Sequence, residues 1–133
     1  MEAKRLGYKK LLLAGHIGKF IKVAAGIFQT HSKVADARNE IMISNLALMG
    51  APVEFLRQID ECVTAEGAVE IIDQSEYTDV YNILCNKCRD RVKQHLGDDS
   101  IDVGVYMFRM DKSYLGKSDN ADSIVEVFRW LIL

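Results

Sequence analysis

The first pattern in the chain is a run of apolar residues that recur every three and four positions between residues 9 and 33. This spacing places five of them on one face of a helix, namely Leu13, Ile17, Phe20, Ala24 and Ile27. We therefore expect a first, basic and amphipathic helix over about residues 3–31. Because interior glycine weakens a helix, a break between residues 15 and 18 stays open as an alternative.

The opposite face of this expected helix carries little bulk and several cations. It collects three glycines and three lysines, namely Gly15, Gly18, Gly26, Lys19, Lys22 and Lys33. A cationic face without bulky side chains suits contact with a protein partner or with phosphate groups. Lys19, Lys22 and Lys33 are therefore the candidate contact residues.

Further helices are expected along the rest of the chain. One covers about residues 35–49, and the next begins at Pro52, which suits a first helical turn, and ends at Gly67. Asp73 and Glu76 have the spacing of a capping box and Gly97 is placed as a C-terminal cap, which predicts a long helix between them. A last helix is expected over residues 120–133.

Strand signals are few. Residues 101–108 alternate in the way that predicts a strand, whereas residues 68–73 are too short for periodicity to decide between a strand and a helical turn. We therefore predict a mainly α fold, a compact bundle of about five helices in one domain over residues 1–133. It would hold at most a small strand pair near residues 68–73 and 101–110.

The composition is that of an ordinary globular domain. The 133 residues are 49% hydrophobic and 27% charged, with a net charge of −2. Basic residues are concentrated in residues 1–38 and acidic residues in the remainder, which permits attraction to nucleic acid, to an acidic membrane or between copies. Three cysteines, with neither a signal peptide nor a spanning segment recognised, predict a cytoplasmic or other reducing intracellular compartment.

No motif for catalysis or metal binding is complete. Cys85 and Cys88 have the CxxC spacing but fall inside an expected helix, away from the helix N-terminus that activates a thiol, so we interpret them as buried core thiols. Residues 116–118 read Gly-Lys-Ser, but Asp111 stands where a Walker A loop needs its first glycine. His16 and His31 lack a partner for nucleophilic catalysis. We predict no catalytic residue, no metal and no cofactor.

A basic cluster lies in the expected long helix that Gly97 ends. Its members are Lys87, Arg89, Arg91, Lys93 and His95. Because cations near a helix C-terminus complement the exposed carbonyl groups, we interpret the cluster as stabilising that helix. Contact with phosphate is the alternative interpretation.

The end of the chain is strongly apolar and predicts self-association through Phe128, Trp130, Leu131 and Ile132. We predict a non-catalytic protein-interaction or assembly module, a small subunit or regulator of a larger complex, whose partner is a protein or a second copy in a homo-oligomer. The first alternative is a nucleic-acid-binding protein that uses the glycine and lysine face. The second, less favoured, is a peripheral membrane-surface binder, because GHIGKFIKVAAGIF is similar in texture to cationic amphipathic membrane peptides.

Overall fold

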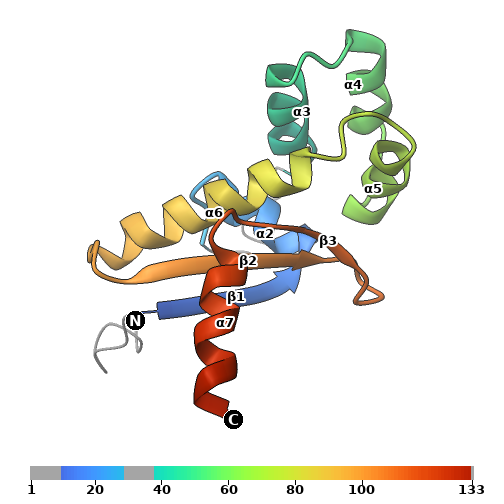
Figure 1. The fold of residues 1–133 in the computed structure, drawn as a ribbon. Helices are drawn as coiled ribbons and strands as arrows, with labels where there is room; N and C mark the ends of the chain where they lie inside the picture. The colour runs from blue at the N-terminus through green and yellow to red at the C-terminus, as the bar shows by residue number, and fades with distance from the viewer. Residues whose placement is uncertain (1–9, 29–37, 133) are drawn as a thin grey trace.

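A computed structural model describes residues 10–28 and 38–132, with side chains as far as residue 126 (Figure 1). Six helices and three strands lie in these residues. In chain order they are β1 (Lys10–His16), α2 (Ile17–Ala24), α3 (Arg38–Leu48), α4 (Val53–Asp60), α5 (Ala65–Asp73), α6 (Val80–Leu96), β2 (Asp102–Phe108), β3 (Tyr114–Lys117) and α7 (Ala121–Ile132). The prediction of a mainly α fold is confirmed, whereas the expectation of at most a small strand pair is wrong, because the sheet has three strands.

The sheet has the order β1-β2-β3, with β2 in the centre. β1 runs parallel to β2, and the register pairs Leu13 with Val105 and His16 with Phe108. β2 and β3 are antiparallel neighbours joined by a short hairpin. The carboxyl ends of β1 and β2 therefore lie side by side at one edge of the sheet, which is where parallel sheets usually place their ligand sites.

The two faces of the sheet are covered by different helices (Figure 1). On one face, Val103, Val105 and Met107 of β2 join the buried core that also holds residues of α2 and α6. On the other face, α7 packs against Gly104, where an added Cβ atom would lie 2.9 Å from Ile124 Cδ1. The alternation expected for residues 101–108 is confirmed, and the absence of a side chain at residue 104 lets α7 approach.

The expected first helix is wrong over residues 10–16, which form β1, while the alternative of a break between residues 15 and 18 is confirmed because α2 begins at Ile17. The three glycines of the expected bare face occupy different settings. Gly15 lies in β1, Gly18 in α2, and Gly26 follows α2 with a φ of +84° that suits glycine. They do not form one face.

Residues 68–73 take the helical alternative and not the strand, since they belong to α5, whose N-cap Thr64 accepts a hydrogen bond from the Gly67 backbone N–H. One further expectation is wrong. Asp73 is the last residue of α5 and does not cap α6, which begins at Val80 and ends, as expected, with Gly97 in the left-handed conformation. Among the described helices, none combines the length and the apolar character needed to cross a bilayer.

Candidate ligand site at the carboxyl ends of the parallel strands

Two hollows open where β1 and β2 end. The first, of about 460 Å³, is lined by residues 14–16 at the end of β1 and by Phe108, Arg109, Met110 and Lys112 at the end of β2 and in the hairpin. The second, of about 320 Å³, lies between the start of α2 and the start of α5. Both hollows are lined by His16 and Met110, and we refer to them together as the strand-end hollow.

His16 occupies the junction of β1 and α2. It is the N-cap residue of α2 with extended backbone angles, but its side chain makes no capping hydrogen bond. A Cβ atom added at Gly18 would lie 3.4 Å from His16 Nδ1, so the glycine leaves room for the imidazole ring. Within the described residues the ring has no hydrogen-bond partner, which leaves both nitrogens available to a ligand.

Gly15 has a separate structural role in the same turn. A Cβ atom added there would lie 2.9 Å from Cζ of the Phe20 ring in α2, so the missing side chain lets this ring pack closely against the turn. The sequence Gly-His-Ile-Gly over residues 15–18 is therefore a strand-to-helix turn that presents a histidine at the strand-end hollow.

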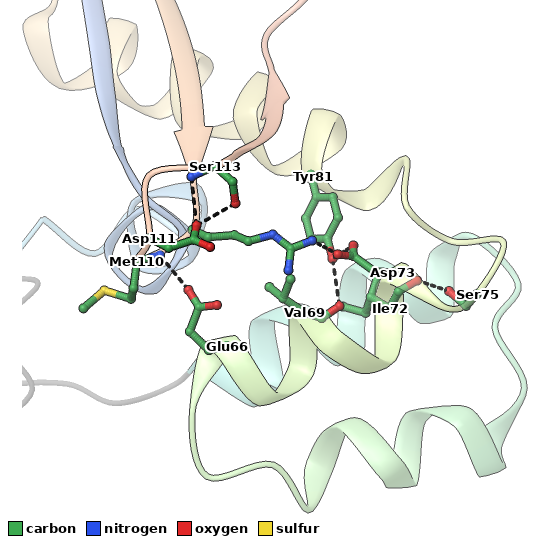
Figure 2. Close-up of polar contacts among 10 residues, drawn as sticks. Glu66, Val69, Ile72, Asp73, Ser75, Tyr81, Met110, Asp111 and Ser113 are labelled. Carbon is green, nitrogen blue, oxygen red and sulfur yellow. Dashed lines mark hydrogen bonds and ion pairs between the residues drawn. The ribbon is translucent and has the colours of Figure 1, made fainter.

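The hairpin between β2 and β3 forms the opposite wall. Its loop is closed by backbone hydrogen bonds from Arg109 N to Ser113 O and from Lys112 N to Arg109 O, both 2.9 Å long. Lys112 has a φ of +71°, a left-handed backbone conformation that residues other than glycine and asparagine seldom adopt. Hydrogen bonds from the Ser113 side chain and backbone to Asp111 lower the pKa of that carboxyl group (Figure 2).

Side chains from α5 and α6 hold this loop in place. Glu66 Oε1 accepts a hydrogen bond from Met110 N at 2.8 Å, and Asp73 forms an ion pair with Arg109 (Figure 2). Asp73 Oδ1 also accepts a hydrogen bond from the Tyr81 hydroxyl at 2.9 Å. Burial raises the pKa of Tyr81, and the nearby charge of Glu66 raises it further, so the hydroxyl stays protonated and remains a donor.

Of the predicted contact residues, Lys19 and Lys22 lie outside the lining of this site. Lys19 is exposed on α2, Lys22 is only 3% exposed, and Lys33 lies outside the described residues. The residues predicted for self-association lie in the part of α7 after residue 126, where the structure describes the backbone alone; they are Phe128, Trp130, Leu131 and Ile132. Contact with a partner or with phosphate, and self-association, stay predictions.

The cysteines of the CxxC motif are core thiols, as expected. Cys85 and Cys88 are fully buried in α6, and both thiols are free. Cys88 Sγ donates a hydrogen bond to Phe20 O at 2.9 Å. Burial raises the pKa of Cys85 to about 12 and raises that of Cys88 as well, so neither thiol is activated at neutral pH.

Sequence reasoning missed most of the strand-end hollow. It assigned no catalytic role to His16 and gave no role to Met110 or Lys112. A signal for His16 was present in the glycines at positions 15 and 18, which suit a turn from a strand into a helix. That signal becomes readable only when residues 10–16 are recognised as a strand.

Comparison with known proteins places the chain in a family. The family described as "CbiD, C-terminal domain" matches residues 29–119. A protein of Clostridioides difficile (strain 630) named cobalt-precorrin-5B C(1)-methyltransferase is 70% identical over 129 residues, which cover 96% of this chain and 32% of that protein. A protein of the same name from Citrobacter koseri is 43% identical over 127 residues, which cover 94% of this chain and 34% of the relative. No solved structure matches.

These relatives correct the predicted function. The expectation of a non-catalytic interaction or assembly module is wrong, as is the expectation that catalysis is absent, because the similar proteins are named as methyltransferases. The nucleic-acid and membrane-surface alternatives are corrected by the same finding. The chain spans about a third of the length of the curated relatives that it matches. Over most of its length this chain belongs to the family of the CbiD C-terminal domain.

Proposed function

We propose that this chain works as part of a cobalt-precorrin-5B C(1)-methyltransferase, and that the strand-end hollow binds a ligand of that reaction. The observation that carries the proposal is the 70% identity over 129 residues to the C. difficile protein of that name. The relatives are about three times as long as the stretch they share with this chain, so the complete activity needs further residues.

The geometry supports a role in binding and orienting. Methyl transfer to carbon requires a donor and an acceptor held in line and shielded from water, and such positioning supplies much of the rate enhancement of two-substrate enzymes. Phe108 and Met110 give the hollow apolar walls, while His16 supplies hydrogen-bonding nitrogens and Lys112 a positive charge. A mainly apolar pocket with a few converging polar groups is the usual form of a small-molecule site.

The anchored hairpin supports the same role. Glu66 and Asp73 fix the loop through one hydrogen bond and one ion pair, so the wall that carries Lys112 is held against α5. A wall held in this way presents its charge without a large loss of conformational freedom when the ligand binds. The reducing intracellular compartment expected from the sequence also belongs to this proposal, in keeping with three cysteines that are all free.

The test is a chimaera in which this chain replaces the matching 129 residues of the C. difficile relative. Methyl transfer to cobalt-precorrin-5B is measured with a sulfonium donor labelled in its methyl group. We expect an active chimaera. Replacement of His16 by Asn should lower kcat/KM by about tenfold or more, because a ligand hydrogen bond is lost while Asn remains a good helix N-cap.

The matched control is His95→Asn, since His95 is exposed near the end of α6 and stacks on Phe28, with ring centroids 4.3 Å apart. This variant should keep the activity of the parent chimaera. A folded chimaera without methyl transfer would contradict the proposed reaction. An active chimaera in which His16→Asn behaves like His95→Asn would contradict the assignment of the strand-end hollow.

A further inference from the structure

A third hollow lies between the end of α2, the middle of α3 and the middle of α6, and it shares no lining residue with the strand-end hollow. It has a volume of about 360 Å³. Ala24 at the end of α2 and its C-cap Ala25 line one side, Ser44 and Asn45 line it from α3, and Lys87 and Arg91 from α6, together with Ile41 and Asp90. The small side chains of the two alanines leave the hollow open, and its polar side chains come from α3 and α6.

The first observation is a buried amide that holds an ammonium group at this hollow. Asn45 is 4% exposed. Its Nδ2 donates to Ile41 O at 2.7 Å, and its Oδ1 accepts a hydrogen bond from Lys87 Nζ at 2.5 Å. An ammonium group has three donors, so Lys87 keeps two N–H groups for a ligand or for water after this bond.

The second observation is a further cation one turn along the same helix. Lys87 and Arg91 are four residues apart in α6 and therefore share a face, where like charges repel. The Arg91 guanidinium group lies against Gly26, because a Cβ atom added to that glycine would be 3.5 Å from Arg91 Nη1. Neither cation forms an ion pair with another described residue. Asp90, the carboxylate at this hollow, is paired instead with Arg89 at 3.0 Å.

Stabilisation of helix ends does not account for these two cations. The carbonyl groups of Lys22 and Val23 at the end of α2 already accept backbone hydrogen bonds from residues 25–27. The last turn of α6 holds Lys93 and His95, whereas Lys87 lies nine residues before the final Leu96. Because the helix dipole acts within the last turn, the earlier interpretation of the basic cluster does not cover Lys87.

We propose that this hollow is a binding site for an oxyanion, a carboxylate or phosphate group, held by Lys87 and Arg91. The guanidinium group offers paired donors that match two oxygens of such a group, and the ammonium group adds a third contact and a second charge. Ser44 lines the same wall and offers a hydroxyl group. The proposal does not depend on methyl transfer, because binding at this site is measured directly.

The experiment is calorimetric titration of the 133-residue chain with inorganic phosphate and, separately, with propionate, against sodium chloride at equal ionic strength. We expect saturable binding of at least one probe, and the two arms distinguish a phosphate from a carboxylate site. Arg91→Gln should weaken that binding by about tenfold, because one charge-assisted contact is lost. Lys93→Gln removes the same charge from the same helix outside this hollow and should leave binding unchanged.

Lys87→Gln should weaken binding similarly, and far-UV circular dichroism establishes whether this variant folds, since it also removes the partner of Asn45. Arg91 is exposed, so Arg91→Gln keeps the test decisive even if the Lys87 variant unfolds. The proposal is overturned if neither probe binds beyond the chloride control. It is equally overturned if Arg91→Gln and Lys93→Gln bind alike.

Discussion

The Glu66 carboxylate accepts a hydrogen bond from the backbone N–H of Met110, 44 residues further along the chain. This bond joins the first turn of α5 to the hairpin loop, and both residues line the second part of the strand-end hollow. The wall of the hollow is thus fixed by a contact between two segments that are distant in sequence. Its loss should affect stability and ligand binding together.

We expect Glu66→Ala to lower the free energy of unfolding by about 1 kcal/mol, because a charge-assisted hydrogen bond and a favourable charge in the first helical turn are both lost. Urea denaturation measures the change. Glu66→Gln keeps an acceptor oxygen and should lose less. Glu70→Ala, on the same helix and exposed, is the control and should stay within about 0.5 kcal/mol of the parent. Equal losses in the two alanine variants would contradict a role for the Glu66 contact.

Lys112 should be a residue at which function and stability oppose each other. Its φ of +71° suits glycine, so Lys112→Gly should raise the free energy of unfolding by about 1 kcal/mol. Because Lys112 lines the strand-end hollow, the same variant should lower methyl transfer by the chimaera. Lys112→Asn, which tolerates this conformation but lacks the charge, should also lower transfer. A stabilised variant with full activity would show that the lysine does not contact a ligand.

The buried thiols predict a loss of stability at alkaline pH. A thiol in the unfolded chain ionises near its ordinary pKa of 9.0, while burial keeps Cys85 protonated up to about pH 12. A raised folded pKa gives stability that is complete below the unfolded pKa and is lost as the pH rises through the folded pKa. The free energy of unfolding should therefore fall from about pH 9 upwards, as measured by urea denaturation at several pH values.

Cys85→Ala should make this pH dependence shallower, even though the variant is less stable at neutral pH because a cavity is left in the core. Cys62→Ser is the control, since Cys62 is only partly buried and should contribute less to the slope. A pH profile of Cys85→Ala that runs parallel to that of the parent would contradict the role of the Cys85 thiol.

Two glycine substitutions should have opposite effects. A Cβ atom at Gly116 would lie 2.7 Å from Tyr81 Cβ and 3.0 Å from the Tyr81 carbonyl carbon, so Gly116→Ala should push β3 from α6 and cost about 1–3 kcal/mol. A Cβ atom at Gly67 in α5 would lie 3.5 Å from Thr64 Oγ1, an ordinary contact distance, so Gly67→Ala should raise helix stability by about 0.5–1 kcal/mol. Thermal unfolding measures both. A neutral Gly116→Ala would mean that β3 packs less tightly.

The sequence predicts the long helix α6 and the strand β2 well, because each is long enough to show its own period and α6 has a glycine at its end. It misleads at residues 10–16. Leu11, Leu12 and Leu13 are compatible with either period, and the partner of this strand lies about 90 residues away, so no local pattern reveals the pairing. The spacing of Asp73 and Glu76 matched a cap, but tertiary contacts with Tyr81 and Arg109 determine the role of Asp73.

The long separation of β1 and β2 in the sequence also hides the candidate site. Phe108, Met110 and His16 become neighbours only through the parallel pairing of β1 with β2, and parallel pairing leaves no turn signature in the sequence. The sequence shows the charges of the basic cluster, but it does not show that Lys87 donates a hydrogen bond to the buried amide of Asn45. That pairing depends on α3 and α6 packing against each other, which residue spacing within either helix does not encode.

The parallel pairing of β1 with β2 also bears on how the chain folds. Closing a segment of about 90 residues carries a large entropy loss that only the completed sheet repays, and topologies of this kind fold slowly. The hairpin of β2 and β3 and the single helices can form from neighbouring residues, whereas the edge at His16 and Phe108 exists only after the two distant strands have met. Ligand capture at that edge therefore requires that β1 and β2 have paired, and a molecule bound there stabilises the native state alone.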